Sequence, residues 1–262
     1  MRGPHACADH ITLKSTMQNL SGRLALVTGA SAGIGEATAR RLSAEGARVV
    51  LAARRMDRLE AIVKDLPNAQ ALELDVRDAD GVRAKLSKFE FDLVIANAGM
   101  AKGTDPIQRV EPDAWDAMID TNVKGVLAVI RACLPGMIAR ERGDMVLLGS
   151  VAGRQVYPGG NVYCATKHAV RALYEALRLD AAGSGIRFTT VDPGMVQTEF
   201  SDVRLGDQAK AKAVYDGFDP LLPDDVADAI AYAVTRPAHV NIGEIVLWPS
   251  AQASTTMVKR SE

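Results

Sequence analysis

Seven short apolar runs, each about the length of a β-strand, recur along the chain, and the segments between them have the apolar spacing of helices. Most of the runs are apolar at successive positions, which is typical of strands that are covered on both faces. This alternation predicts a single α/β domain with a doubly wound parallel sheet of about seven strands, helices on both faces and right-handed crossovers. The runs are 24–28, 48–52, 70–74, 93–96, 145–148, 187–191 and 244–248.

Three longer segments stand apart from this alternation. Residues 112–140 predict one extended helix that is interrupted near Leu134-Pro135-Gly136, and residues 161–182 predict a second long helix. Residues 193–223 have weak periodicity and scattered Gly and Pro. A loop that long within a compact domain is usually functional, and we expect it to act as a lid over a site.

The charge balance excludes several classes of partner. The chain has 262 residues, with 31 Lys and Arg against 32 Asp and Glu, so its overall charge gives no reason to bind nucleic acid or an acidic membrane surface. No apolar run approaches the roughly 18 residues of a membrane span. The 3 cysteines are odd in number and have no zinc-like spacing, so we expect reduced thiols, no metal and a cytoplasmic location.

The start of the chain does not resemble the remainder. Residues 1–19 have neither helical nor strand periodicity and lack the apolar core of a secretory signal. We expect a flexible extension there, followed by one domain over residues 20–262. Met17 lies just before the first strand and is our candidate for the natural start. Loss of folding or activity on deletion of the first sixteen residues would refute that assignment.

A glycine-rich turn follows the first predicted strand. Gly29, Gly33 and Gly35 lie between that strand and a helical pattern, with Ser31 and Ile34 among them. Glycines let the backbone turn tightly and approach a ligand, and a helix N-terminus offers free N–H groups to a pyrophosphate. The spacing differs from G-x-G-x-x-G. The strand-turn-helix context favours a dinucleotide site over a plain turn.

Two arginines follow the second predicted strand and indicate which dinucleotide binds. A site for NAD places an acid near the end of this strand, whereas a basic residue suits the 2′-phosphate of NADP. Here Arg54 and Arg55 follow Ala53, and a guanidinium can hold a phosphate through two parallel hydrogen bonds. Solvation of a helix start is the alternative reading. We predict NADP(H), with Arg54 as the better candidate.

A tyrosine and a lysine have the spacing of a proton-transfer pair. Tyr163 and Lys167 are four residues apart at the start of a predicted helix, so their side chains share one face. A free phenol has a pKa of about 10, and a neighbouring ammonium lowers it. The phenol could then exchange a proton with a carbonyl or alcohol oxygen. Such a pair alone would more often be helix surface.

Other polar residues lie where the ends of parallel strands would bring them to the same crevice. Ser150 ends the fifth predicted strand, where its hydroxyl could bond the reacting oxygen. Asn97 follows the fourth strand, with Ala98 and Gly99, and Asn122 lies in the long helix after it. The simpler readings are a turn residue for Asn97 and a helix-surface or kink-stabilising amide for Asn122.

In their order along the chain, these motifs resemble those of the short-chain dehydrogenases/reductases. The resemblance extends over nearly everything from Leu20 to Trp248. Each motif is weak alone, and together they are specific. The motifs are Thr28-Gly29-x-x-x-Gly33-x-Gly35, Asp75, Asn97-Ala98-Gly99, Asn122, Ser150, Tyr163-x-x-x-Lys167 and Pro193-Gly194-x-x-x-Thr198.

The resemblance implies a Rossmann-like fold and a role for each matching residue. Ser150 would orient the carbonyl and Tyr163 would transfer the proton. Lys167 would hold the nicotinamide ribose and lower the tyrosine pKa, while Asn122 would support a water on the proton path to Lys167. The remaining matches would bind the cofactor: Asp75 and Val76 beside the adenine, Asn97 along the groove, and Val196 and Thr198 near the nicotinamide.

One position departs from the pattern of many NADP-using members. They carry a basic residue before the middle glycine of the turn, where this chain has Ala32. The prediction of NADP therefore depends on Arg54 and Arg55. Three stretches, 157–163, 198–204 and 237–242, resemble members that use NADP to oxidise 3-hydroxy acids or serine, or to reduce sulfoacetaldehyde.

Those substrates are small and anionic, and an arginine near the reacting carbon would suit them. We hypothesise that Arg154 or Arg204 binds the carboxylate or sulfonate. The alternatives are a reductase of bulkier neutral ketones or aldehydes, with both arginines solvated, and a non-catalytic protein that binds NADP. The resemblance also implies a homotetramer or homodimer in which the two long helices pair between subunits.

Overall fold

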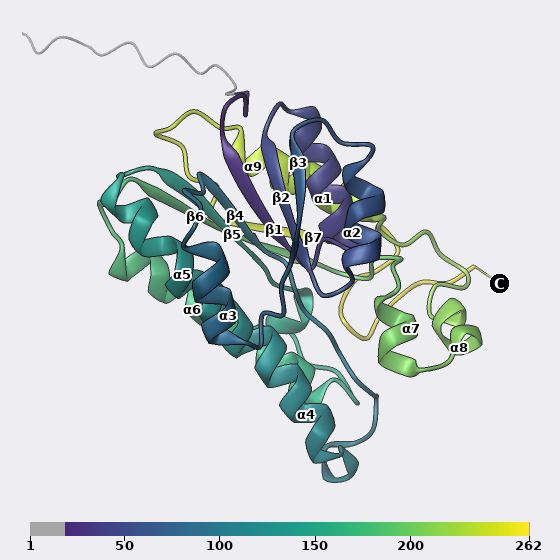
Figure 1. Ribbon diagram of the computed structural model, residues 1–262. Coiled ribbons are helices and arrows are strands. Elements are labelled where there is room, and N and C mark those ends of the chain that lie inside the picture. Colours follow the sequence, from purple (N-terminus) through teal and green to yellow (C-terminus); the bar gives the residue numbers. More distant parts are fainter. Residues whose placement is uncertain (1–18, 262) are drawn as a thin grey trace, which may run out of the picture.

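The computed structural model describes residues 19–261, and the expected N-terminal extension therefore lies almost wholly outside the described residues. Within this range, seven parallel strands form one sheet with the order β3-β2-β1-β4-β5-β6-β7 (Figure 1). The predicted strands and fold class are confirmed, with bounds that differ by at most two residues at either end. The strands are β1 (Leu24–Thr28), β2 (Arg48–Ala53), β3 (Ala69–Glu73), β4 (Leu93–Ala96), β5 (Gly143–Leu148), β6 (Ile186–Pro193) and β7 (Glu244–Leu247).

Helices cover both faces of the sheet (Figure 1). Apolar side chains form one buried cluster on each face, because the strands are apolar on both sides. One layer holds α1, α2 and α9, and the other holds α3, α5 and α6. The helices are α1 (Gly33–Ala44), α2 (Met56–Val63), α3 (Ala79–Leu86), α4 (Pro112–Ile119), α5 (Gly125–Ala139), α6 (Asn161–Asp180), α7 (Phe200–Leu205), α8 (Gln208–Ala213) and α9 (Pro223–Val234).

The long helix after β4 is irregular at a different place from the one predicted. Helices α4 and α5 are joined without a break by a π-helical segment, Asp120–Lys124. The predicted interruption near Pro135 was wrong, since Pro135 lies inside α5. Pro135 is exposed, so solvent can reach the carbonyl group that it leaves without an amide partner. The π segment instead turns Asn122 into the interior, where the residue is 1% exposed.

The α4–α5 helix differs from the sequence expectation that no segment is apolar enough over the length of a membrane span. Residues 112–139 are long and apolar enough to cross a membrane by length and composition, although the criterion is also met by core helices of other proteins. One face carries the buried Val129 and Met137 and packs into the core, while Ile119, Leu127 and Ile138 are exposed on the helix.

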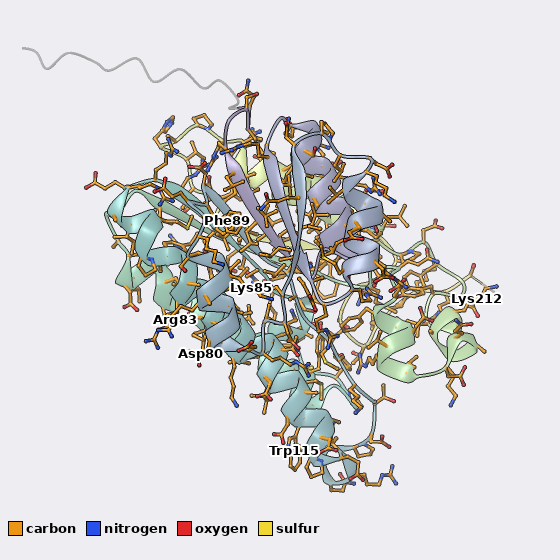
Figure 2. The ribbon with its side chains drawn as sticks, viewed as in Figure 1. Asp80, Arg83, Lys85, Phe89, Trp115 and Lys212 are labelled. Atoms are coloured by element: carbon orange, nitrogen blue, oxygen red, sulfur yellow. The ribbon has the colours of Figure 1, made fainter. Side chains whose placement is uncertain are left out.

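The segment predicted as a long loop contains two short helices, α7 and α8. Gly206, in the left-handed conformation with φ of 63°, separates them. Figures 1 and 2 show two projections at the same end of the sheet: α4, marked by Trp115, and the pair α7 and α8, marked by Lys212. The space between the β1 and β4 ends, where the strand order reverses, lies at this end and is where open α/β sheets bind ligands.

Candidate active site

A crevice of about 620 Å³ opens at the carboxyl ends of the strands. Its lining comes from the glycine turn after β1, the ends of β2 to β6, the start of α6 and the segment before α7. All residues predicted to contact the cofactor line it. They are Gly29, Ser31, Gly33, Ile34, Gly35, Arg54, Arg55, Asp75, Val76, Asn97, Ala98, Gly99, Tyr163, Lys167, Pro193, Gly194, Val196 and Thr198.

The backbone of the glycine turn is packed too closely to accept side chains. Gly29 has a φ of 66°, and a Cβ on Gly35 would lie 2.4 Å from the Gly29 carbonyl oxygen. Helix α1 begins at Gly33 without a side-chain cap, so its first N–H groups face the crevice unpaired by any capping side chain. A close backbone and free amides at a helix N-terminus suit a phosphate ligand.

The two arginines after β2 differ in what they contact. Arg55 donates hydrogen bonds from Nε and Nη2 to the Ser31 hydroxyl in the glycine turn, over 3.1 and 3.0 Å. Its Nη1 donates to Glu199, over 3.0 Å. Arg54 also lines the crevice, and its charge helps to lower the pKa of Asp75. The sequence favoured Arg54, whereas the structure connects Arg55 directly to the turn.

Two of the predicted groove residues are held by their neighbours. The Asn97 amide donates to the Thr28 carbonyl over 2.7 Å and so fastens the end of β4 to the end of β1. The Asp75 carboxylate accepts a hydrogen bond from Arg77 Nε over 3.0 Å. This bond is the main reason that the pKa of Asp75 is lowered, and it keeps the carboxylate ionised.

Asn122 connects three segments of the chain. Its side-chain oxygen accepts from the Met100 N–H and its amide donates to the Met100 carbonyl, each over 2.8 Å. The same amide donates to the Thr166 hydroxyl over 3.0 Å. Asn122 thereby joins the π segment to the chain after β4 and to α6, next to Lys167. The reading of Asn122 as a helix-surface residue is excluded by its burial.

The other three residues of the predicted tetrad meet at the floor of the crevice. Ser150 and Lys167 are buried, and Tyr163 is partly exposed at the start of α6. The Lys167 ammonium donates to the Leu148 carbonyl over 2.8 Å and lies 6.0 Å from the centroid of the Tyr163 ring. A phenol, a hydroxyl and an ammonium at one point of a crevice can bind and protonate a substrate oxygen.

Burial and neighbouring groups set the protonation states of this cluster. Burial raises the pKa of Tyr163, and a hydrogen bond with Ser150 and the charge of Arg204 oppose that rise. The prediction that Lys167 lowers the pKa of Tyr163 was wrong: this pKa is raised, and the groups that oppose the rise are Ser150 and Arg204. Burial also lowers the pKa of Lys167 to about 8, opposed by the charge of Asp192.

The two arginines predicted to bind an anionic substrate have different surroundings. Arg154 Nε donates to Asp192 over 2.6 Å, and its Nη2 donates to Glu244. The structure disfavours the prediction that Arg154 binds the substrate anion, because two carboxylates already neutralise its charge. Neither Arg154 nor Arg204 is among the residues that line the crevice, so the pairing of their charges is what distinguishes them.

Arg204, in contrast, is half-buried among neutral acceptors. It donates to the Gly103 and Gly159 carbonyls and to the Tyr157 hydroxyl, over 3.2, 3.3 and 2.8 Å. Its guanidinium lies 5.8 Å from the centroid of the Tyr163 ring. Within residues 19–261, no carboxylate pairs with it. A shielded cation with no counter-ion favours an anionic ligand.

The structure adds residues that the sequence reasoning did not select. Glu199 joins Arg55 and Arg58, with a distance of 2.6 Å to Arg58. Phe200 lines the crevice with its ring 5.6 Å from that of Tyr163. The spacing Arg54-Arg55-x-x-Arg58 was the visible signal for Arg58. No pattern in the sequence links Glu199 to a helix more than a hundred residues earlier.

Comparison with known proteins gives a consistent result. A sequence model of the family described as short chain dehydrogenase matches residues 23–208. The chain is 41% identical over 238 residues to a Salmonella typhi protein named NADP-dependent 3-hydroxy acid dehydrogenase YdfG, covering 88% of this chain and 96% of the relative. It is 40% identical over 258 residues to a Schizosaccharomyces pombe protein named NADP-dependent 3-hydroxy acid dehydrogenase, covering 94% and 100%.

Among solved structures, the chain resembles the closed form of serine dehydrogenase complexed with NADP+. The two are 39% identical with a TM-score of 0.87, and the match covers 91% of this chain and 100% of the other.

Proposed function

The chain belongs to the short-chain dehydrogenase family, and from this premise we propose that it is an NADP-dependent oxidoreductase that interconverts a small anionic hydroxy compound and its aldehyde or ketone. The proposal rests on one observation: Tyr163, Ser150 and Lys167 meet at the floor of a crevice, and the glycine turn forms the other end of that crevice. We favour a 3-hydroxy acid as the substrate class, since relatives that are 40% and 41% identical to this chain are named 3-hydroxy acid dehydrogenases.

The residues of the crevice fit a nicotinamide dinucleotide. A Cβ at Gly35 would clash with the backbone of the turn, so this tight turn requires glycine, and the free amides of α1 suit the pyrophosphate. Arg54 and Arg55 would hold the 2′-phosphate that distinguishes NADP from NAD. Asp75 and Val76 would border the adenine, Asn97 to Gly99 the groove, and Pro193 to Thr198 the nicotinamide end. The bound nicotinamide supplies or accepts the hydride.

Tyr163 is the residue that we assign to proton transfer. Burial raises its pKa, so the phenol is protonated at neutral pH and can give its proton to a carbonyl oxygen. Ser150 would hold that oxygen through its hydroxyl. Lys167 and Asn122 act next to this pair: Lys167 would bind the nicotinamide ribose, and Asn122 fixes the position of α6 through Thr166.

We assign recognition of the substrate anion to Arg204. Its guanidinium lies beside the Tyr163 ring, and three neutral acceptors hold it there. A guanidinium has five N–H donors, so donors remain for a carboxylate. A charge-assisted bond at this place would hold the acid group while the hydroxyl-bearing carbon lies over Tyr163.

The test is an assay at the absorbance band of the reduced nicotinamide, with NADP+ or NAD+ and with 3-hydroxybutyrate or its neutral methyl ester. We expect turnover with NADP+, and a higher kcat/KM for the acid than for the ester. In Arg204→Gln, we expect the KM for the acid to rise about tenfold or more, from the loss of one charge-assisted bond. A higher kcat/KM for the ester would instead favour bulkier neutral substrates, which Phe200 and Val203 could contact.

We further propose a homodimer or homotetramer in the cytoplasm. Three exposed apolar residues on the α4–α5 helix, Ile119, Leu127 and Ile138, support this assembly, because exposed apolar side chains can mark a surface that a partner covers. Cys133 and Cys164 are free and buried, as expected of reduced thiols. Sedimentation of the purified protein tests the assembly, and a monomer at micromolar concentration would refute it.

A further inference from the structure

Helix α7 crosses the crevice and is fastened at both of its ends. Before its first residue, Glu199 pairs with Arg55 over 3.0 Å and with Arg58 over 2.6 Å, on the side of β2 and α2. At its other end, the Arg204 carbonyl accepts from the Gly103 N–H over 2.8 Å, on the side of β4 and α4. Phe200 and Val203 lie between these two attachments and line the crevice.

Arg55 uses two different edges of its guanidinium. The edge formed by Nε and Nη2 faces the glycine turn, where its acceptor is the neutral Ser31 hydroxyl. The Nη1 group faces away from this edge and donates to the Glu199 carboxylate. A phosphate could therefore replace or share the hydroxyl on the first edge while the ion pair on Nη1 remains in place.

We propose that Glu199 is a positioning residue for NADP(H): it holds Arg55 with one edge toward the 2′-phosphate, and in this way it links occupancy of the phosphate site to the placement of α7 over the reaction centre. The inference rests on NADP(H) being the cofactor and on no particular substrate. Because coupling between two sites is reciprocal, a 2′-phosphate should stabilise α7, and an ordered α7 should favour the 2′-phosphate.

An electrostatic effect and an entropic effect oppose each other here. The Glu199 carboxylate repels a nearby phosphate, whereas its hold on Arg55 removes the entropy cost of ordering a long side chain when the phosphate binds. Glu199 is 47% exposed and Arg55 43% exposed, so water screens the repulsion. The carboxylate also remains paired with Arg58, which neutralises part of its charge. We conclude that positioning outweighs repulsion.

The first test measures binding without any substrate or nicotinamide. Adenosine 2′,5′-bisphosphate carries the 2′-phosphate, and adenosine 5′-monophosphate lacks it. By titration calorimetry, we expect Glu199→Gln to raise the Kd of the bisphosphate about fivefold, the scale of an exposed ion pair, and to leave that of the monophosphate unchanged. Asp202→Asn is the control, since Asp202 also lies in α7 and makes no ion pair in the described residues. An unchanged or lower Kd for the bisphosphate would overturn the proposal.

The second test follows α7 itself by hydrogen exchange of the amides of residues 199–206. The bisphosphate should slow exchange there in the unmodified protein and in Asp202→Asn, but not in Glu199→Gln. Equal protection by the two nucleotides, or protection that persists in Glu199→Gln, would show that α7 does not sense the 2′-phosphate through Glu199. Neither readout depends on turnover, so failure here is distinguishable from a wrong substrate class.

Discussion

Arg204 places its guanidinium 5.8 Å from the centroid of the Tyr163 ring, and the charge of this arginine counters the rise that burial causes in the tyrosine pKa. The two residues lie on separate helices, α7 and α6, and are about forty positions apart in the sequence. One arginine can therefore serve both substrate binding and proton transfer, and these two roles respond differently to pH.

The first prediction concerns the pH profile of Arg204→Gln. Oxidation of an alcohol needs a deprotonated Tyr163, so its rate rises as pH approaches the tyrosine pKa. Without the positive charge the phenolate is less stable and the pKa rises further. The ascending limb of kcat/KM for alcohol oxidation should therefore move to higher pH. The methyl ester substrate isolates this effect from binding of the carboxylate. An ascending limb at the same pH as in the unmodified protein would contradict this prediction.

The second prediction concerns Tyr163→Phe. Removing the hydroxyl deletes the proton donor, and we expect kcat to fall about 10²-fold to 10⁴-fold. The ring remains to pack against Phe200, so the Kd of NADPH, measured by fluorescence, should change less than about twofold. If the variant turned over at the unmodified rate, proton transfer would have to be assigned to another group.

The third prediction concerns stability rather than binding. Arg154 pairs with Asp192, whose side chain is 2% exposed. In Arg154→Met the buried carboxylate loses its counter-charge, and we expect the free energy of unfolding to fall by about 3 kcal/mol. Urea denaturation measures this change. Removing Asp192 as well, in Arg154→Met/Asp192→Asn, should restore part of the loss. The KM for the acid should change far less than in Arg204→Gln, and the reverse order would reinstate Arg154 as the anion-binding residue.

The contrast between these arginines shows where sequence reasoning reaches its limit. The strands were predictable because burial on both faces demands consecutive apolar residues, as in Leu24–Thr28. Residues that line the crevice were predictable because the ends of parallel strands converge. Arg154 and Arg204 both follow such ends, and no local pattern distinguishes one from the other. The choice depends on which carboxylates lie nearby in space.

Two other features depend on tertiary packing in the same way. The π segment at Asp120–Lys124 was missed because its cause, the bonds from Asn122 to Met100 and Thr166, joins distant parts of the chain. The ion pairs of Glu199 were missed because they link the segment before α7 to α2. Local periodicity contains no information on either contact. The prediction at Pro135 failed for the opposite reason: it relied on the local tendency of proline to interrupt a helix, which does not interrupt α5.

The fourth prediction tests the role of Asn122. In Asn122→Leu, the Met100 N–H and carbonyl lose their partners while they are still held near the crevice. We expect a loss of about 2–4 kcal/mol in the free energy of unfolding, because unsatisfied buried groups are costly. Asn161→Leu serves as the control, since its amide donates to the Asp105 carbonyl at the surface, and it should lose less than about 1 kcal/mol. Equal losses of unfolding free energy in the two variants would show that burial of the Asn122 hydrogen bonds contributes nothing to stability.

The fifth prediction separates the two halves of the cofactor site. In Gly35→Ala the new methyl group would lie 2.4 Å from the Gly29 carbonyl oxygen and 2.6 Å from the Asn97 amide nitrogen, so the turn must shift. The pyrophosphate is common to NADP+ and NAD+, and the Kd of both should therefore rise by a similar factor, about tenfold or more. Arg55→Leu, in contrast, should weaken the binding of NADP+ alone.

Gly136→Ala, on the exposed side of α5, controls for the substitution itself. It should be neutral or slightly stabilising, since alanine favours a helix over glycine. If Gly35→Ala weakened only NADP+, the glycine turn would be contacting the 2′-phosphate rather than the pyrophosphate, and its assignment would have to be exchanged with that of Arg55.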